Sequence, residues 1–309
     1  MVTNESFKAS QMNSASDVTY TDQPVYQFTI YTSTASQWAY VPQLALVQEG
    51  YNPSEYDSQH IDLVGGENFN PDYLKINPNG TIPSLTSPAL QRPLIESVDI
   101  LEYLDSFRRE KFPLFPTNAE QRSRVNDLIA HVHQEKLSTN LILLKARDLS
   151  ELNAKRASLW NDFLVNRQKK LIKYGAAHPE IPLYQIRIQE NGKLYDIYKN
   201  QKGGTALDQF FSDSEHDYQV FATGLDKLDT MLILPYAVGD NVTAADLHVV
   251  PWLAHALWGA GGSQVYDFNP LEKLIQKSVP QFCFGEKTKA WWQNISKTNA
   301  FRKNYPALH

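Results

Sequence analysis

Residues 76–104 constrain this chain more than any other segment. A proline follows a β-branched residue at Ile82–Pro83, where a strand is expected to begin, and Glu96–Ser97 precedes an amphipathic pattern that predicts a helix. If the Ile82–Pro83 peptide bond is cis, the chain turns sharply and the backbone N–H and C=O of Ile82 face outward. An extended peptide can then pair with Ile82 as an added strand.

The start of the predicted helix offers complementary contacts for such a peptide. Free N–H groups after Ser97 favour a carboxylate, and Glu96 beside them can pair with an ammonium group. Glutathione has a cysteinyl amide in its middle and a free amino acid at one end, so it fits both places. Each residue alone also fits an ordinary role, Pro83 as a trans proline at a strand edge and Ser97 as a helix cap.

Two motifs in this segment match a known family in order and spacing. Residues 77–85 read N-P-N-G-T-I-P-S-L, and residues 96–104 read E-S-V-D-I-L-E-Y-L. They resemble the patterns N-P-x-G-x-V/I-P-x-L and E-S-x-x-I-x-x-Y-L of the cytosolic glutathione transferase superfamily, especially its fungal-type and bacterial-type members. The sequence Thr243-Ala244-Ala245-Asp246 extends the resemblance, because the family carries such a capping box in its second domain. Residues 148–217 are longer than the family norm.

The resemblance implies two domains, and local patterns agree with it. We predict a disordered tail at 1–22, an α/β thioredoxin-like, glutathione-binding domain at 23–110, a linker at 111–117 and an all-α, acceptor-binding domain at 118–309. Strands are predicted at Val25–Tyr31, within Tyr56–Val64 around His60–Leu63, at Ile82–Leu85 and at a short edge near Arg92–Ile95. Helices are predicted at Trp38–Gly50 and Val98–Phe107. Helical patterns follow at 119–144, 152–174, 218–232, 244–258 and 271–277.

The insertion at about 148–217 interrupts the all-α pattern. Tyr184–Tyr198 alternates around Asn191-Gly192, which favours a β-hairpin over a surface loop. The polar, glycine-containing stretch 201–217 predicts a mobile loop. Because a two-stranded ribbon is marginal alone, the hairpin should pack on the mouth of the acceptor pocket or on a partner subunit, and we favour the pocket mouth.

Composition narrows the class of protein. With 309 residues and 42% hydrophobic residues, the chain can bury the cores of two domains. A net charge of −5 argues against nucleic acid as a partner. One cysteine, Cys283, allows no disulfide within the chain, which suits a reducing compartment. No run of about 20 apolar residues predicts a membrane span, so we expect a cytoplasmic protein.

The family pattern implies which side chain would activate the glutathione thiol. A thiol needs a hydrogen-bond donor, best placed at a helix N-terminus after the first strand, to ionise near neutral pH. The family's catalytic residue lies eight positions before an L-A-L sequence, here residues 44–46, and this spacing selects Ser36. Ser33 and Thr34 are the alternatives, with Tyr31 as a further one. No cysteine lies nearby, so thiol-transfer chemistry is not expected.

The sequence departs from the family at the other end of the ligand. Many relatives hold the glycyl carboxylate of glutathione with charged or amide side chains at positions that correspond here to Asn68, Phe69 and Thr81. None of these is charged, so glutathione binding is expected to be weak unless Lys75 or His60 compensates. His131 and His133 face apart on a helix, so no metal site is predicted.

The function that the resemblance implies is a glutathione transferase. Glutathione would lie along Asn68, Thr81, Ile82 and Pro83 with its free amino acid at Glu96 and Ser97, and its thiolate would attack a hydrophobic electrophile. The same site would also serve a glutathione-dependent isomerase of a secondary metabolite or other small molecule. A non-catalytic binding or regulatory protein is the third reading. The family is usually homodimeric, and glutathione is the only cofactor or cosubstrate implied.

Overall fold

A three-stranded sheet organises the N-terminal region of the computed structural model, which describes residues 27–108, 113–200 and 203–309. Its strands are β1 (Phe28–Thr32), β2 (Tyr56–His60) and β3 (Ser84–Thr86), in the order β2-β1-β3. β1 runs parallel to β2 and antiparallel to β3. The tail predicted at 1–22 lies outside the described residues, as do 111–112 of the predicted linker.

Three strands lie close to their predicted positions, and the fourth does not form. β2 occupies the first five residues of the predicted range Tyr56–Val64 and ends at His60, where the stretch His60–Leu63 on which the prediction was centred begins. Its sequence, YDSQH, is polar and partly exposed at the sheet edge. No hydrophobic alternation marks such a strand. The edge strand predicted at Arg92–Ile95 was wrong: Leu94 makes only an isolated antiparallel bridge with Leu85.

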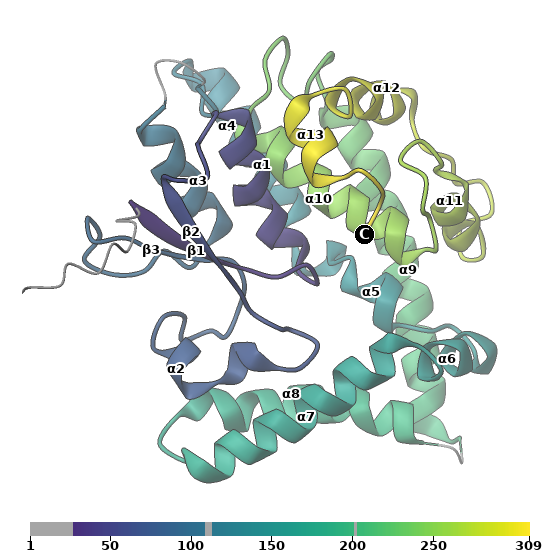
Figure 1. Cartoon of the computed structure of the whole chain (residues 1–309). Helices are drawn as coiled ribbons and strands as arrows, with labels where there is room; N and C mark the ends of the chain where they lie inside the picture. Colours follow the sequence, from purple (N-terminus) through teal and green to yellow (C-terminus); the bar gives the residue numbers. More distant parts are fainter. Residues whose placement is uncertain (1–26, 109–112, 201–202) are drawn as a thin grey trace, which may run out of the picture.

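Short helices complete this thioredoxin-like region, and α1 and α3 contact each other beside the sheet (Figure 1). They are η1 (Gln37–Ala39), α1 (Tyr40–Gln48), η2 (Glu67–Phe69), α2 (Pro71–Leu74) and α3 (Ser97–Ser106). Leu44 of α1 and Ile100 of α3 share one core with Phe28 and Ile30 of β1. The helices predicted at Trp38–Gly50 and Val98–Phe107 are thus confirmed to within a few residues.

The rest of the chain is helical in the described ranges. Its elements are α4 (Ala119–Val132), η3 (Glu135–Leu137), α5 (Asn140–Leu144), α6 (Leu149–Arg156), α7 (Leu159–Ala177), α8 (Pro182–Lys199), α9 (Thr205–Met231), α10 (Ala244–Gly259), α11 (Asn269–Gln276), α12 (Glu286–Ile295) and α13 (Asn299–Asn304). The single helices predicted at 119–144 and 152–174 are each broken. The second breaks where the Ser158 hydroxyl accepts the Trp160 N–H and starts α7.

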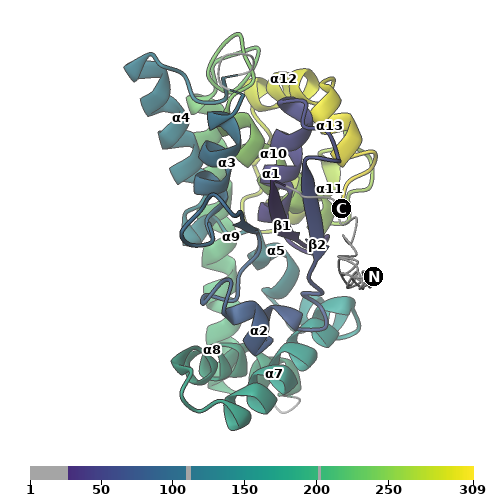
Figure 2. The same ribbon diagram turned by 60° about the vertical axis from the view of Figure 1, so that its left-hand side comes forward.

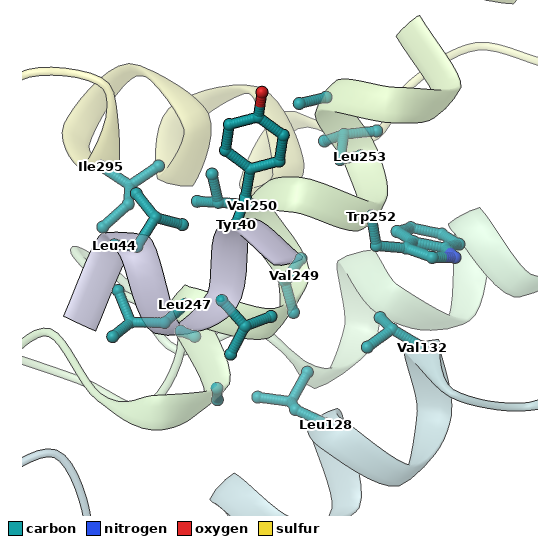
Figure 3. Close-up of a cluster of buried hydrophobic side chains, with 14 of the residues drawn as sticks. Tyr40, Leu44, Leu128, Val132, Leu247, Val249, Val250, Trp252, Leu253 and Ile295 are labelled. Atoms are coloured by element: carbon teal, nitrogen blue, oxygen red, sulfur yellow. The ribbon is translucent and has the colours of Figure 1, made fainter. Parts of the chain in front are cut away.

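Helix α10 is the centre of the main core. Residues 244–257 are buried on every side, and Figure 3 shows Val249 and Trp252 of α10 among side chains from α1, α4 and α12. The predicted capping box forms, with Thr243 and Asp246 exchanging hydrogen bonds. Asp246 also accepts the Ala237 N–H and the Trp291 indole N–H, each at 2.8 Å. The box therefore links three segments of the helical region.

The predicted β-hairpin at Tyr184–Tyr198 was wrong, since this segment is most of the continuous helix α8. Tyr184, Asn191 and Tyr198 are its buried residues, and their spacing of seven places them on one face of a helix. Asn191 donates to Gln168 of α7 at 2.7 Å. Gly192 does not have a positive φ angle, so the Asn-Gly pair makes no turn.

The loop predicted at 201–217 was also largely wrong, because α9 begins at Thr205. Leu207, Phe210, Ser214 and Tyr218 are buried at helical spacing, so the polar residues between them cover the exposed face. Only residues 200–204 lie between α8 and α9.

Helices α7 and α8 form an antiparallel pair that reaches back to the N-terminal region. Figures 1 and 2 show the pair beneath α2. Leu171 of α7 and Tyr184 of α8 share a buried cluster with Phe69 and Leu74. The Tyr184 hydroxyl donates to the Phe69 carbonyl at 2.8 Å. The insertion therefore packs on the elements that precede the Ile82–Pro83 turn.

Candidate functional site

The backbone before β3 is held by two side chains. The Ile82–Pro83 bond is cis. The Thr81 carbonyl accepts the Tyr73 hydroxyl at 2.7 Å and the Asn77 amide at 2.8 Å. Since a carbonyl oxygen has two lone pairs, these donors satisfy it fully and fix the orientation of the peptide that follows. Ile82 can then present its own backbone groups in one direction.

Gly80 and Asn68 fix the other side of this turn. Gly80 has a φ angle of +61°, and a Cβ at this position would lie 3.1 Å from the Asn68 carbonyl oxygen. The Asn68 side-chain amide donates to the Gly80 carbonyl at 2.7 Å. Glycine is required here both by the left-handed backbone and by the close approach.

Ser36 lies directly beside the Ile82 backbone. It caps η1 after β1, where its Oγ accepts the Ala39 N–H at 3.3 Å and donates to the Ile82 carbonyl at 3.1 Å. Ser33 is buried and Thr34 is exposed, and neither lines the cavity described next. Of the three serine and threonine candidates, Ser36 alone makes a hydrogen bond with Ile82 within the described chain.

A cavity of about 260 Å³ opens at Ser36 between the two regions. Its lining from the N-terminal region is Ala35, Ser36, Gln37, Trp38, Leu63, Asn68, Asn79, Gly80, Thr81 and Ile82. Its lining from the helical region is Ser138, Asn140, Leu143, Leu144, Trp160, Phe163, Arg167, Arg187 and His255. A larger cavity of about 470 Å³ lies elsewhere, beside Leu114 and Thr243, and includes no candidate residue.

Glu96 and Ser97 stand beside the turn rather than in this cavity. Leu85 pairs with Leu94 in an antiparallel bridge, and extending that register by two residues sets Pro83 opposite Glu96. Glu96 is exposed at the start of α3, and its side chain makes no capping bond. Partial desolvation and the nearby Asp99 raise the pKa of the Glu96 carboxyl. A ligand on the outer edge of Ile82 can therefore reach Glu96 at one end and the cavity at the other.

Ser97 is buried and is tied to the helical region. Its Oγ lies 3.3 Å from His248 Nε2, and His248 Nδ1 lies 2.8 Å from the Ala244 carbonyl. Burial, together with the neighbouring His133, lowers the pKa of His248 to about 3, so the ring is neutral. The Nδ1–H then donates to Ala244 and Nε2 accepts the Ser97 hydroxyl. The backbone N–H of Ser97 is thus a better donor for a ligand than its hydroxyl.

A second buried histidine lies on the cavity wall near Ser36. His255 Nδ1 is 2.7 Å from Thr139 Oγ1, and the Thr139 hydroxyl donates to the side-chain carbonyl of Gln37. Because that hydroxyl proton is engaged by Gln37, His255 must donate its Nδ1–H to Thr139. Burial lowers the pKa of His255 to about 4. The ring is therefore neutral and places Nε2 as an acceptor.

Sequence reasoning missed the residues that α7 and α8 contribute. Trp160, Phe163 and Arg167 follow one another at helical spacing of three and four on α7. The arginine within this otherwise aromatic helix face was the sequence feature that could have indicated a ligand-binding residue. Lys75 and His60, expected as compensating cations, do not line the cavity. Lys75 pairs with Asp72 at 2.6 Å, with its side chain 75% exposed.

Comparison with known proteins agrees with this geometry. A family profile described as glutathione S-transferase, N-terminal domain, matches residues 30–112. A glutathione S-transferase domain-containing protein of Dictyostelium discoideum is 32% identical over 100 residues, which cover 32% of this chain and 38% of that protein. Glutathione S-transferase 1 of Dianthus caryophyllus is 24% identical over 232 residues, 75% of this chain and 78% of that protein.

Residues 30–112 therefore carry a glutathione S-transferase N-terminal domain, and the comparisons support the cytosolic glutathione transferase superfamily. The solved human glutathione S-transferase T1-1 has this superfamily's fold and superposes with a TM-score of 0.54, at 15% identity, over 90% of this chain and 88% of that one. A β-etherase of Sphingobium superposes with a TM-score of 0.55, at 15% identity, over 91% and 99%. The sequence match spans well under half the length of the first Dictyostelium relative.

No helix in the ranges 27–108, 113–200 and 203–309 is long and apolar enough to cross a bilayer. Within the same ranges, no group of three or more histidine, cysteine or acidic residues is arranged to hold a metal ion. Cys283, the single cysteine, is exposed ahead of α12, in a segment separate from the cavity.

Proposed function

We propose that this protein is a glutathione transferase that activates glutathione with Ser36. The observation that carries the proposal is the Ser36 hydroxyl at 3.1 Å from the carbonyl of Ile82, the residue before the cis proline, at the mouth of the cavity. A cysteinyl residue paired with the Ile82 backbone would bring its sulfur next to this hydroxyl. The γ-glutamyl end would reach Glu96 and the N–H groups at the start of α3.

Ser36 can then stabilise a thiolate without large movement. Its oxygen already accepts the Ala39 N–H at the start of η1, so the hydroxyl proton is free to turn from the Ile82 carbonyl to the sulfur. A hydrogen bond to the charged form lowers the thiol pKa. The thiol proton leaves to solvent, and the sulfur attacks an electrophilic carbon of the acceptor, which expels its leaving group with the bonding electron pair.

The cavity walls support a hydrophobic acceptor. Leu63, Leu143 and Leu144 line the cavity, together with the aromatic residues Trp160 and Phe163. Apolar and aromatic side chains combined with polar groups are typical of small-molecule sites, and these walls can hold the apolar part of an acceptor. We therefore assign glutathione binding to residues 23–110 and acceptor binding to 118–309, with α7 and α8 as a wall of the acceptor pocket.

Isomerisation is the second candidate. A maleylacetoacetate isomerase of Pseudomonas aeruginosa is 34% identical over 110 residues, 34% of this chain and 47% of that protein. In that reaction class the thiolate adds, a bond rotates and the thiolate leaves, so glutathione is regenerated. Measuring glutathione consumption during turnover separates the two: conjugation depletes it in proportion to product, and isomerisation leaves it unchanged.

The test of the proposed function is Ser36→Ala with Ser33→Ala as its control. A hydrogen bond to a charged group is worth about 1.5–3 kcal/mol, so Ser36→Ala should slow conjugation to 1-chloro-2,4-dinitrobenzene by about 10- to 150-fold. It should also raise the pH at which bound glutathione ionises, followed by thiolate absorbance. Ser33→Ala should change neither. Equal activity of wild type and Ser36→Ala would refute the assigned role.

A further inference from the structure

Arg167 is a cation in the cavity whose charge is offset only in part by Glu190, a carboxylate that already pairs with Arg187. Its guanidinium lies 4.5 Å from the centre of the Phe69 ring and 5.8 Å from that of Phe163. It makes no hydrogen bond or ion pair with any residue in the described ranges. Burial, and then the charge of Arg187, lowers the pKa of Arg167 to about 10. The guanidinium is therefore charged at neutral pH in surroundings that disfavour the charge.

Arg187 brings a second cation to the same cavity. It pairs with Glu190 at 2.6 Å through Nη1, but its Nε is buried and has no partner among the described residues. The cavity lining contains no aspartate or glutamate in the described chain. Two guanidinium groups beside one carboxylate leave a net positive charge, and the Arg187 Nε–H remains an unused hydrogen-bond donor among the described residues. An anionic group of a ligand could neutralise this charge and accept that hydrogen bond.

These arginines lie close to the positions at which the N-terminal region lacks a cation for a ligand carboxylate. The superfamily positions at Asn68, Phe69 and Thr81 carry no cation, yet Arg167 lies on the Phe69 ring and shares the cavity with Asn68 and Thr81. A peptide paired with Ile82 whose amino end lies at Glu96, opposite Pro83, has its other end on the Thr81 side. That end is the glycyl carboxylate of glutathione.

We propose that Arg167 and Arg187 form a carboxylate-binding subsite that the α7–α8 insertion adds to the N-terminal site. Arg167 carries most of the interaction, because Arg187 is already paired with Glu190. The inference rests on the proposed function where it names glutathione as the ligand. Carboxylate binding by the two arginines does not depend on that function. The carboxylate comes either from the glycyl residue or from an anionic acceptor, since both would enter the same cavity.

The test compares carboxylate and amide forms of two ligands. The first pair is glutathione and its glycyl amide, measured by calorimetry. The second pair is 4-chloro-3,5-dinitrobenzoate and the corresponding benzamide, measured without glutathione by quenching of tryptophan fluorescence, which Trp160 in the lining should report. For at least one pair, wild type should bind the carboxylate about tenfold or more tightly than the amide.

Arg167→Gln should bring that ratio close to one and leave amide binding unchanged. Arg167→Lys should restore part of the ratio, and Arg187→Gln should reduce it less. The matched control is Lys169→Gln, which removes an exposed cation two residues away on the same helix. Thermal unfolding of each variant checks that it folds.

The two arms separate the outcomes. A ratio that depends on Arg167 for glutathione assigns the glycyl carboxylate, and one that depends on Arg167 for the benzoate pair assigns the acceptor. If wild type binds neither form of glutathione, the proposed function fails while the benzoate pair still tests the subsite. Ratios near one for both ligand pairs in wild type, or ratios that persist in Arg167→Gln, overturn the subsite.

Discussion

At the scale of residues, the Ile82 carbonyl would link peptide capture to thiol activation in the proposed mechanism. It accepts the Ser36 hydroxyl at 3.1 Å and, with its second lone pair, can also accept a cysteinyl N–H. Tyr73 and Asn77 fix the preceding carbonyl, that of Thr81. Loss of either donor should therefore disturb the geometry at Ile82 although neither residue touches the cavity.

Glu96 gives the site a pH dependence whose direction is set by its neighbours. Partial desolvation and Asp99 raise the pKa of the Glu96 carboxyl, so it takes up a proton at a higher pH than the ordinary value of about 4.3. Pairing with an ammonium group requires the carboxylate. Glutathione affinity should therefore fall as pH is lowered through this raised pKa.

Asp99→Asn tests that dependence. Removing the neighbouring charge should lower the pKa of Glu96 and move the loss of affinity to lower pH in calorimetric titrations. Glu102→Gln, on the same helix but paired with Arg122, should leave the profile in place. A profile identical in wild type and Glu96→Gln would mean that Glu96 does not hold the ligand's ammonium group.

At the scale of elements, short-range signals predicted the segments that are defined locally. The turn at Ile82–Pro83, the start of α3 and the capping box at Thr243 each depend on residues within a few positions of one another. The segment 184–198 failed because its alternating residues and Asn-Gly pair match a hairpin as well as a helix. The helix is favoured because it buries Tyr184, Asn191 and Tyr198 on one face against elements distant in sequence.

Some residues of the candidate site could likewise be predicted from local patterns, and others could not. Ser36, Thr81 and Ile82 were predictable because a family pattern fixes their spacing, and the structure places all three around one cavity. Arg167 was not predictable, because its place depends on α7 packing on η2, nearly a hundred residues earlier in the chain. A weakly matched insertion offers no pattern from which such a contact can be inferred.

Tyr184 is the element-scale test of that packing. Tyr184→Phe removes the hydroxyl that donates to the Phe69 carbonyl at 2.8 Å and leaves a buried acceptor unpaired. The expected loss in unfolding free energy is about 1–3 kcal/mol, measured by urea denaturation. Tyr174→Phe, on α7 in the same cluster, should cost much less, because the Tyr174 hydroxyl makes no hydrogen bond with any described residue. Equal losses would show that the hydrogen bond does not secure the helix pair.

At the scale of the whole molecule, the cavity is assembled from both regions. The N-terminal region supplies Ser36 and the turn, and the helical region supplies apolar walls and the arginines. Ser97 and His248 join the regions at a second place, beside the start of α3. The α7–α8 pair beneath α2 in Figure 1 forms a third contact. A ligand in the cavity should therefore stabilise elements that are far apart in sequence.

Hydrogen exchange measures that coupling directly. Glutathione should slow exchange at residues 76–84, where it pairs with Ile82, and also across α7–α8, where Arg167 holds its carboxylate, because local opening of both would release the ligand. In Arg167→Gln at saturating glutathione, protection at 76–84 should remain while that of α7–α8 falls. Helix α4, whose residues do not line the cavity, is the internal control. If wild type shows slowed exchange at 76–84 alone, the two regions do not share the bound ligand, and α7–α8 acts only as packing for the N-terminal region.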